Sequence, residues 1–485
     1  MREWPAVADR ALSADPSFDS ESLAAAVGGA VLRGGTRQIR GGAVDSRHVE
    51  PGNAFFALPG ERTDGHRFVV AAARAGAAAL VVARAPSDAD MATLDGLGGV
   101  AVIVVDDTLV ALRAAASAWR SRFTPLVVGV TGSLAKTSTK EQTAEVLAVR
   151  WRVLRNRANE NNEIGLPLTL LRLSPEDEAA VLEMGMYTPG DIRILAEVAR
   201  PTIGLVTAVR GAHLERAGSI EAIESGKREL VEALPAGGTA VLNADDARVT
   251  RMADHAPVGV NIVRYGFSST AGVSAVDVES LSARGMRFRL QTDAGSVDVT
   301  IPALGRHSVH NALAAAAVGL TATLTLDEIA AGLARPSGAP HRTTLIETGR
   351  WTILDDTYNA APDSMVAALD LLASLPGRRV AVLGAMLELG PESDASHRLV
   401  GGHAARTADV LVAVGAPAQI YADAAEAAGM DPEAVHIARD RDAALAALRR
   451  ILRPSDVVLL KASNGERFFD LVDELRALSQ PETVA

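Results

Sequence analysis

The sequence predicts an α/β protein of three domains built around a central, mostly parallel sheet. Its 485 residues amount to roughly three domains of typical size. Apolar stretches of strand length alternate with helical stretches rich in Ala, Leu, Glu and Arg, which is the pattern of parallel α/β sheets. The predicted strands lie at 77–83, 100–105, 126–130, 180–184, 202–209, 239–243, 379–384, 409–415 and 456–462.

Two segments with helix-breaking residues divide the chain. Pro125 opens a strand after a helical stretch, and the Pro, Gly and Ser residues of 334–342 separate a helix from the strand WTILDD. We therefore expect domain boundaries that divide the chain into residues 1–123, 124–337 and 338–485.

One segment of the expected central domain breaks the α/β alternation. Within residues 273–302, the stretches MRFRLQT and SVDVTIP alternate at period two around Asp-Ala-Gly, as the two strands of a hairpin do. We expect this segment to be an antiparallel insertion.

Composition excludes several classes of site. The 48 Lys and Arg residues against 59 Asp and Glu residues give a net charge of −11, which disfavours nucleic acid as a partner. Because the chain has no Cys, a thiolate nucleophile, an iron–sulfur cluster and Cys-bound zinc are excluded, and any metal must bind O or N ligands. No apolar stretch has the length of a signal peptide core or a membrane span, so we expect a cytoplasmic protein without membrane insertion.

The segment LVVGVTGSLAKTSTK (126–140) reads as a strand, a turn and a helix start. Backbone N–H groups of such a turn can bind phosphate, with Lys136 over the outer phosphates and Thr137 on Mg²⁺. The strict phosphate-loop pattern fails at both of its glycine positions, where Val130 and Ala135 stand. Taken alone, the motif leaves a nucleotide site and an ordinary strand-to-helix turn equally open.

Polar side chains follow two other predicted strands. Glu183 ends one strand and His213 follows the next, so both are expected at the rim where open α/β sheets bind ligands. They could share a metal ion with nucleotide phosphate, whereas a lone His is more often a hydrogen-bonded structural residue. Lys227 lies in a helical stretch, where a solvated surface lysine is the alternative.

Further polar residues each allow a structural interpretation. His307 and His310 flank Asn311 at a helix start, where either ring could cap the helix or face solvent. Asp356 could be a turn residue, and adjacent Asn161 and Asn162 could cap a helix or face a substrate. In the N-terminal domain, Asp45-Ser46-Arg47 and Asp64-Gly65-His66 could each be a turn with a surface salt bridge.

Read together, these segments resemble the Mur ligase family, and within it the members that join D-alanyl-D-alanine to a UDP-N-acetylmuramoyl-tripeptide. The resemblance spans roughly residues 44–470 and rests on the order of its motifs more than on any one of them. The segments that carry it are DSRHVEPGNAFFALPGERTDGH, the 126–140 segment, NENNEIGLPLTLL, AVLEMGMYTPGDI, TAVRGAHLERAGSIEAIESGKREL, GRHSVHNALAAAA, PHRTTLIETGRWTILDDTYNAAPDSM, VLGAMLELG and VLLKASNGERF.

The resemblance implies a role for each domain: a small N-terminal α/β domain for the UDP-substrate, a central P-loop-type ATPase domain and a C-terminal Rossmann-like domain for the amine. It implies an ATP-dependent ligase of peptidoglycan precursor synthesis that uses Mg²⁺ and proceeds through an acyl phosphate. The expected partners are UDP-N-acetylmuramoyl-peptide and D-Ala-D-Ala as small-molecule substrates, and the expected state is a monomer.

The resemblance also assigns roles to individual residues. It implies catalytic roles for Lys136, Glu183, His213, Lys227 and Arg342. The implied metal ligands are Thr137, Glu183, His213 and Lys227 as a carbamate. The implied nucleotide-binding residues are Gly132, Ser133, Lys136, Thr137, Ser138, Asn311, Arg342 and Asp356. The implied substrate-binding residues are Asp45, Ser46, Arg47, Asp64, His66, Asn161, Asn162, Tyr358 and Asn359.

The chain departs from the family pattern at Ala135, Ala361, Ala385, Ala462 and Asn464. The family has glycine before the phosphate-loop lysine, a second asparagine in Tyr-Asn-Ala-Asn-Pro, aspartate in Gly-Asp-Met-Leu-Glu-Leu-Gly, and Gly and Arg in Lys-Gly-Ser-Arg. The last three departures concern the domain that receives the amine. They keep two alternatives open: a ligase for a different acid or amine, and a non-catalytic homologue that binds nucleotide.

Overall fold

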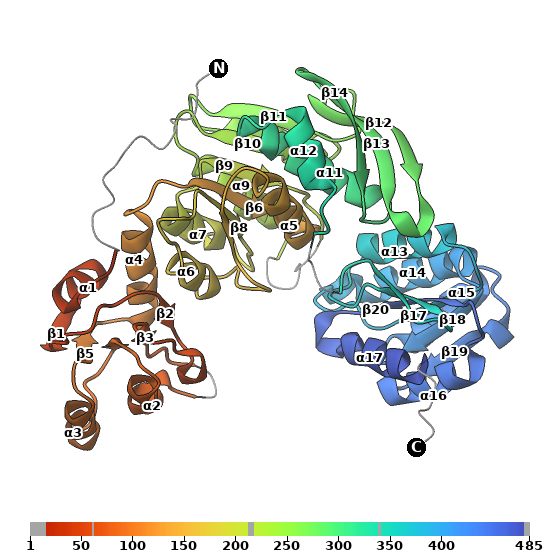
Figure 1. Cartoon of the computed structure of the whole chain (residues 1–485). Helices are drawn as coiled ribbons and strands as arrows, with labels where there is room; N and C mark the ends of the chain where they lie inside the picture. The colour runs from red at the N-terminus through yellow and green to blue at the C-terminus, as the bar shows by residue number, and fades with distance from the viewer. Residues whose placement is uncertain (1–15, 61–62, 212–217, 338–340, 480–485) are drawn as a thin grey trace.

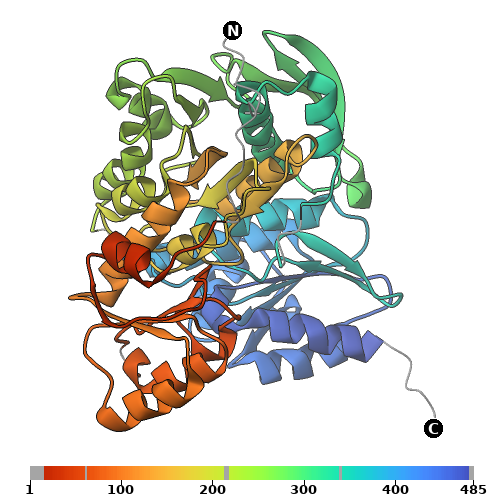
Figure 2. The same ribbon diagram turned by 60° about the vertical axis from the view of Figure 1, so that its left-hand side comes forward.

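The computed structural model describes residues 16–60, 63–211, 218–337 and 341–479, which form three α/β units (Figure 1). The central unit lies at the top of the molecule, and the N-terminal and C-terminal units lie below it on either side in both views (Figures 1 and 2). The predicted α/β class with a mostly parallel central sheet is confirmed. No helix within the described ranges combines the length and apolarity needed to cross a bilayer.

The N-terminal unit is a five-stranded sheet of order β1-β5-β4-β3-β2, parallel except where β1 pairs with β5. Its strands are β1 (Ala30–Arg33), β2 (Gly42–Ala43), β3 (Ala54–Phe56), β4 (Ala79–Val82) and β5 (Ala101–Val104). Its helices are α1 (Ser20–Val27), α2 (Val69–Arg74), α3 (Asp88–Leu97) and α4 (Thr108–Arg120).

The central unit is a nine-stranded sheet of order β14-β13-β12-β11-β10-β9-β6-β8-β7. Its strands are β6 (Leu126–Thr131), β7 (Val153–Arg155), β8 (Ala179–Glu183), β9 (Ile203–Val206), β10 (Thr239–Asn243), β11 (Asn261–Tyr265), β12 (Val273–Ser280), β13 (Met286–Thr292) and β14 (Gly295–Ile301). Its helices are α5 (Lys136–Leu147), α6 (Gly165–Leu170), α7 (Asp191–Ala199), α9 (Ile220–Glu232), α10 (Ala247–Arg251), α11 (Arg306–Thr321) and α12 (Leu326–Leu333).

The C-terminal unit is a six-stranded sheet of order β15-β16-β20-β17-β18-β19, in which β15 alone runs antiparallel to its neighbour. Its strands are β15 (Thr344–Glu347), β16 (Thr352–Asp355), β17 (Arg379–Leu383), β18 (Val410–Val414), β19 (Val435–Ala438) and β20 (Val457–Lys461). Its helices are α13 (Pro362–Ser374), α14 (Ser393–Thr407), α15 (Ala418–Ala427), α16 (Arg441–Ile451) and α17 (Phe468–Ser479).

Every predicted strand is present, within a residue or two for most of them. The central strands are buried on both faces, which explains their continuous apolar runs: Val128 and Val130 pack toward α5 and α11, whereas Val127 packs toward α6 and α7. The segment 273–302 forms the predicted antiparallel hairpin, β13 with β14, and β12 joins it to the parallel part of the sheet. The insertion therefore widens the central sheet instead of forming a separate layer.

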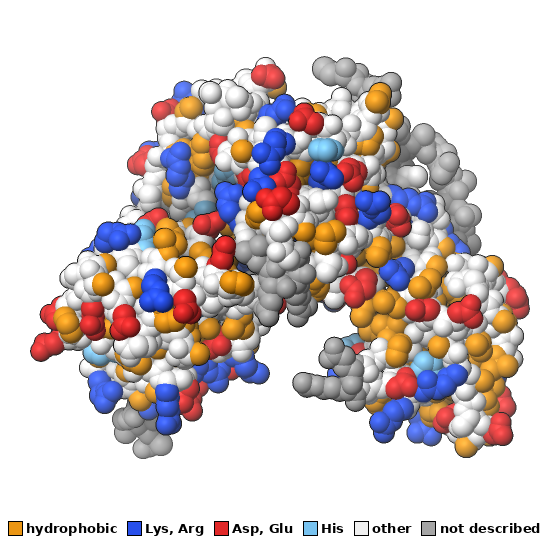
Figure 3. Space-filling view, turned by 180° about the vertical axis from the view of Figure 1, so that it is seen from behind, with side chains coloured by type: hydrophobic (Ala, Val, Ile, Leu, Met, Phe, Trp, Pro, Cys, Tyr) orange, Lys and Arg blue, Asp and Glu red, His pale blue; other side chains and the backbone are white. Residues whose placement is uncertain are grey.

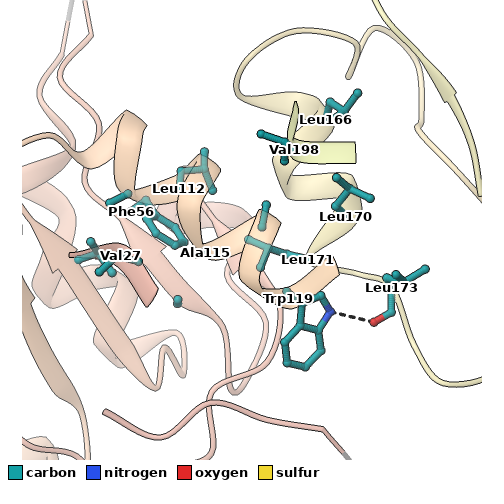
Figure 4. Close-up of a cluster of buried hydrophobic side chains, with 14 of the residues drawn as sticks. Val27, Phe56, Leu112, Ala115, Trp119, Leu166, Leu170, Leu171, Leu173 and Val198 are labelled. Atoms are coloured by element: carbon teal, nitrogen blue, oxygen red, sulfur yellow. Dashed lines mark hydrogen bonds between the residues drawn. The ribbon is translucent and has the colours of Figure 1, made fainter. Parts of the chain in front are cut away.

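Helix α4 joins the N-terminal unit to the central unit through one shared hydrophobic core. Leu112, Ala115 and Trp119 on α4 are buried in the same cluster as residues of the N-terminal sheet and of α6 and α7 (Figure 4). The indole Nε1 of Trp119 donates a hydrogen bond of 2.9 Å to the carbonyl of Leu173, and Arg120 Nε donates one of 3.1 Å to Ala199. The two units are thus held by packing and by buried hydrogen bonds.

Two buried tryptophans offer a matched test of this junction. Trp119→Phe removes a hydrogen bond and leaves the Leu173 carbonyl unpartnered. Trp351→Phe removes no hydrogen bond, because the Nε1 of the buried Trp351 has no partner among the described residues. We expect Trp119→Phe to lower the unfolding free energy by about 1–3 kcal/mol more than Trp351→Phe does. Calorimetric unfolding of the two variants measures this difference, and equal losses would show that the Trp119 hydrogen bond contributes nothing.

Candidate active site

A cleft of about 1400 Å³ is lined by the central and C-terminal units and by Arg113 of α4. Its walls are the loops after β6, β8, β9 and β10 together with the start of α11 on the central unit, and the loops after β16, β17 and β20 on the C-terminal unit. From behind, the molecule is hollowed between its two lower lobes (Figure 3). Because ligands bind at the carboxyl ends of parallel strands, two such binding edges here face one another across the cleft.

The loop between β6 and α5 has the backbone of an anion site. Gly132 has a φ of +151°, and a Cβ there would lie 1.8 Å from the Thr207 hydroxyl, so only glycine fits. No side chain caps the N-terminus of α5, which leaves its first N–H groups directed toward the end that faces the cleft. Ser133 and Ser138 also line the cleft, and the Ser133 hydroxyl donates to the carbonyl of Arg210 at 3.0 Å.

Four side chains cluster at this loop. The ammonium of Lys136 donates to the carbonyl of Gly132 at 2.8 Å, and its pKa is lowered by burial, an effect that the Glu183 carboxylate opposes. The Thr137 hydroxyl donates to Glu183 Oε2 at 2.8 Å and accepts a hydrogen bond of 3.0 Å from Arg342 Nη2. The sequence positions 136, 137, 183 and 342 are therefore brought together, across two units, as expected.

Arg342 also has an unused donor. Its guanidinium lies 3.9 Å from the centre of the Tyr358 ring, and its buried Nε has no hydrogen-bond partner among the described residues. A buried N–H without an acceptor is costly, and an anionic ligand in the cleft would satisfy it. This orphaned donor, the uncapped helix and Lys136 together fit a phosphate group.

Glu183 is held in place by residues that the sequence pattern did not single out. Asn156 is buried and bonds the Glu183 backbone on both sides, accepting from its N–H and donating to its C=O, each at 3.0 Å. Asn156 follows β7, so its amide continues the β7–β8 pairing by one more residue. The fully buried Lys140 donates to the Asn156 carbonyl at 2.7 Å and pairs with Glu141. The only sign of this support in the sequence was Lys140, a lysine on the buried face of α5.

The two adjacent asparagines serve different purposes. Asn161 Nδ2 donates to Glu183 Oε1 at 2.8 Å and lines the cleft. Asn162 Oδ1 accepts from the backbone N–H groups of Ile164 and Gly165 and so caps the start of α6. The capping interpretation is thus confirmed for Asn162, which also lines the cleft, whereas contact of either residue with a substrate stays a prediction.

Lys227 is not the solvated lysine that its helical context allowed. It is 3% exposed, and burial together with the nearby charge of Lys136 lowers its pKa well below the usual value. It lies four residues after Ile223 and four before Val231, both buried, so the helical period places it on the inner face. Its amine has no hydrogen bond or ion pair with any residue in the described ranges.

His213 lies outside the described residues, so the structure does not place it. Within the described ranges, no three His, Asp or Glu side chains are grouped as a metal site. The hard oxygens that are present, the Thr137 hydroxyl and the Glu183 carboxylate, are ligands that Mg²⁺ accepts. Without Cys or a described His cluster, this donor set suits Mg²⁺ better than zinc or copper.

The other end of the cleft is built around the start of α11. Asn311 is buried and accepts a 3.4 Å hydrogen bond from Thr139 of α5. His310 neither caps the helix nor faces solvent, because its Nε2 lies 3.1 Å from Asn243 Oδ1 and 3.2 Å from Asp245 Oδ2. Burial lowers the pKa of His307. Asn243 and Asp245 are cleft residues that sequence reasoning missed.

Asp356 is an ion-paired cleft residue and not merely a turn residue. Its carboxylate pairs with the buried Lys461 and accepts a 3.1 Å hydrogen bond from the N–H of Thr343. Lys461 also donates to the carbonyl of Asn359 at 2.9 Å, and both residues line the cleft. Lys461 could have been suspected from the sequence, because a lysine ends an otherwise apolar buried strand.

The N-terminal candidates Asp45, Ser46, Arg47, Asp64 and His66 do not line this cleft. Asp45 caps a short turn and pairs with the exposed Arg47, which lowers the pKa of the Asp45 carboxyl to about 2. Asp64 pairs with Arg84 and lies 2.7 Å from His66 Nδ1, while His66 Nε2 accepts from the N–H of Ala83. The structure thus shows a turn with a salt bridge at each segment, and contact of these residues with a UDP-sugar stays a prediction.

The departures from the family pattern fall into two groups. Ala385 and Ala462 are buried behind the cleft wall. Ala135, Ala361 and Asn464 line the cleft, and Ala361 also precedes α13, whose N-terminus it cannot cap. Ala135 has a φ of +62°, in the left-handed region that favours glycine, so this backbone does not suit alanine.

This strain predicts opposite effects for two alanines at the ends of α5. Ala135→Gly should raise the unfolding free energy by about 0.5–1 kcal/mol because glycine adopts the left-handed backbone without a Cβ clash. Ala148→Gly, at the right-handed C-cap of the same helix, should lower it by about 0.5–1 kcal/mol. Denaturant unfolding of both variants tests the prediction; equal losses in the two would mean that Ala135 is unstrained.

Comparison with known families agrees with this geometry. The Mur ligase family, catalytic domain matches residues 38–120, the Mur ligase middle domain matches 130–319, and the Mur ligase, glutamate ligase domain matches 341–464.

Named relatives and solved structures match over most of the chain. The UDP-N-acetylmuramoyl-tripeptide--D-alanyl-D-alanine ligase of Synechocystis is 40% identical over 89% of this chain and 91% of its own length; that of Escherichia coli is 38% identical over 90% and 93%. The crystal structure of MurF from Acinetobacter baumannii is similar with a TM-score of 0.85 at 30% identity, covering 96% of this chain and all of its own. MurF from Thermotoga maritima, in complex with ADP, has a TM-score of 0.78 at 28% identity, covering 91% and 98%. With named relatives 38–40% identical over about nine-tenths of it, the chain belongs to the Mur ligase family.

Proposed function

We propose that this protein is an ATP-dependent ligase that joins D-alanyl-D-alanine to UDP-N-acetylmuramoyl-tripeptide in peptidoglycan precursor synthesis. The observation that carries the proposal is the cluster of Lys136, Thr137, Glu183 and Arg342 at an uncapped helix N-terminus. This cluster lies in a cleft between the central and C-terminal units, and relatives named for this activity match about nine-tenths of the chain.

The reaction begins with attack of the terminal peptide carboxylate on the γ-phosphorus of ATP, which releases ADP and gives an acyl phosphate. Lys136 and Arg342 offset the charge on the transferred group, and the N–H groups of α5 bind the phosphates that remain. When bound, Mg²⁺ neutralises phosphate charge. Thr137 and Glu183 would hold it, with His213 and a carbamylated Lys227 as further ligands.

The second step forms the amide bond. The amine of the dipeptide attacks the acyl carbon, a tetrahedral intermediate forms, and phosphate leaves as the C–N bond is completed and the amine loses a proton. The loops after β17 and β20 face the phosphate loop across the cleft and would receive this amine. Holding both reactants in one closed cleft supplies proximity and excludes water from the acyl phosphate.

Several finer assignments belong to the same proposal. Asn311 and Asp356 contact the adenosine, Asn161, Tyr358 and Asn359 contact the peptide, and the N-terminal turns at Asp45 and Asp64 contact the UDP-sugar. We place the domain boundaries at 123/124 and 337/338, and the separate sheets of the three units support a division into three domains. The enzyme acts as a cytoplasmic monomer, where ATP and the nucleotide-linked precursor are found, and so serves cell-wall growth, cell shape and division.

Product analysis tests the proposal directly. The protein is incubated with ATP, UDP-N-acetylmuramoyl-tripeptide and an equimolar pool of amino acids and dipeptides, and products are identified by mass spectrometry. The proposal predicts one product, extended by D-Ala-D-Ala. A product with another amine would favour the alternative raised by Ala385, Ala462 and Asn464, and nucleotide binding without any product would indicate a non-catalytic homologue.

Lys136→Ala should slow phosphoryl transfer by about 10²-fold or more, because it removes a cation that stabilises the transition state. Phosphate release, measured with acid and amine substrates at saturation, reports this loss, while the thermal unfolding temperature should stay close to that of the wild type. A turnover within a few-fold of wild type would contradict the phosphate-loop role.

Lys227 should react with CO₂ because burial and the charge of Lys136 lower the pKa of its amine, which favours the neutral form that CO₂ attacks. We expect one carbamate signal in ¹³C NMR with labelled bicarbonate, absent in Lys227→Ala and fading as the pH falls through the lysine's pKa. The variant should lose most of its activity and regain part of it with added acetate or formate. Lys140 serves as the internal control, because it is also buried but, unlike Lys227, has an ion-pair partner in Glu141. Wild-type turnover of Lys227→Ala at saturating Mg²⁺ would refute the role.

A further inference from the structure

The cleft wall of the C-terminal unit includes a loop that follows β17. Leu387, Glu388 and Leu389 of this loop line the cleft. The backbone before them is tied to the neighbouring strand, since the N–H of Gly384 donates to the Lys461 carbonyl at 3.0 Å and that of Leu387 donates to the Ser463 hydroxyl at 2.9 Å. The loop that contains residues 384–389 is called the β17 loop below.

A buried histidine supports the β17 loop from behind. His397 of α14 is 2% exposed, and its Nε2 accepts a 3.1 Å hydrogen bond from the N–H of Met386. Its Nδ1 lies 2.7 Å from the carbonyl of Ser393 and donates to it. Because Nε2 accepts while Nδ1 donates, only the neutral ring with its proton on Nδ1 makes both bonds.

A buried tyrosine completes the support. Tyr421 of α15 packs edge-on against the His397 ring, with centroids 5.1 Å apart, and its hydroxyl donates to the Gly384 carbonyl at 2.9 Å. The two side chains therefore bond a C=O and an N–H that lie two residues apart on the β17 loop. Neither side chain lines the cleft, so each acts on it through this backbone.

We propose that His397 and Tyr421 are positioning residues that fix the β17 loop and thereby set the affinity of the cleft for the incoming amine. The inference rests on the ligase activity proposed above. It assigns the loop to the amine because the loop belongs to the C-terminal sheet, whereas the phosphate loop and the start of α11 belong to the central sheet. Loss of the support should therefore weaken amine binding and spare the nucleotide.

Protonation of His397 would break the support. Burial lowers the pKa of His397, and the Ser393 carbonyl and the charge of Asp394 oppose this shift. Tyr421, the titratable group packed on the ring from α15, stays neutral because burial raises its pKa. His397 is thus neutral near pH 7 and above. As the pH falls below the ordinary value of 6.5, protonation competes with the bond from Met386, and the loop loses this anchor.

Kinetics of four variants test the proposal. At pH 8, His397→Leu should raise KM for D-Ala-D-Ala roughly tenfold, because it leaves the Met386 N–H without an acceptor, while KM for ATP changes less than about twofold. His397→Gln retains an acceptor and should restore KM for the dipeptide to within about threefold of wild type. Tyr421→Phe should raise the same KM by a smaller factor.

The control is His403→Leu. His403 lies on the same helix but pairs with Asp370 on another face, so its substitution should leave both KM values unchanged. The pH dependence supplies a second readout. Below pH 6.5 the dipeptide KM of the wild type should rise more steeply than that of His397→Gln, in which no ring titrates. Protonation of the substrate amine affects both proteins equally and cancels in this comparison.

Several results would overturn the inference. Equal rises in the dipeptide and ATP KM values would show a general structural role, and an unchanged dipeptide KM in folded His397→Leu would show none. If His397→Leu does not fold, the other two variants decide. The inference is rejected if Tyr421→Phe leaves the ratio of the dipeptide KM to the ATP KM unchanged and the dipeptide KM of His397→Gln depends on pH as that of the wild type does. Failure of the wild type to ligate any amine would instead reject the proposed function.

Discussion

The site depends on one buried carboxylate. Glu183 ends β8 inside the protein, and its two oxygens each accept a hydrogen bond, from Thr137 and from Asn161. Asn156 fixes its backbone. A buried anion is tolerable only when it is bonded and balanced by charge, and here the nearby cations are Lys136 and Arg342. The arrangement of the phosphate loop, β7, β8 and the C-terminal unit follows from that requirement.

Contacts between neighbouring units bring the three units to one site. Arg342 reaches the Thr137 hydroxyl of the central unit, and Arg210 of the central unit pairs with Asp363 at the start of α13 at 3.1 Å. On the other side, α4 shares a core with α6 and α7 and brings Arg113 to the cleft. Packing and buried hydrogen bonds hold the N-terminal unit. The C-terminal unit is held by the polar contacts of Arg342 and Arg210 and by Leu304, which lies before α11 and is buried in the C-terminal core.

The features that the sequence predicted are those encoded by a run of many residues, such as the longer strands. Strands such as 126–130 and 456–462 were predictable because buried parallel strands are continuous apolar runs, while β2 and β7, of two and three residues, were too short to leave a pattern. Lys136, Glu183 and Arg342 were identified by motif. Long-range partners could not be identified from the sequence, because the contact of Asn156 with Glu183 spans 27 residues. The positive φ of Ala135 is a backbone property that an alanine in the sequence does not indicate.

In the proposed mechanism, the cluster around Glu183 transfers a phosphoryl group to a carboxylate before the amide bond forms. Isotope transfer tests it most directly: the peptide substrate is labelled with ¹⁸O in its terminal carboxylate, and the phosphate released during ligation is analysed by mass spectrometry. An acyl phosphate requires one carboxylate oxygen to leave with phosphorus, so we expect one ¹⁸O in each phosphate formed. Phosphate without label, released at the same rate as product, would contradict it.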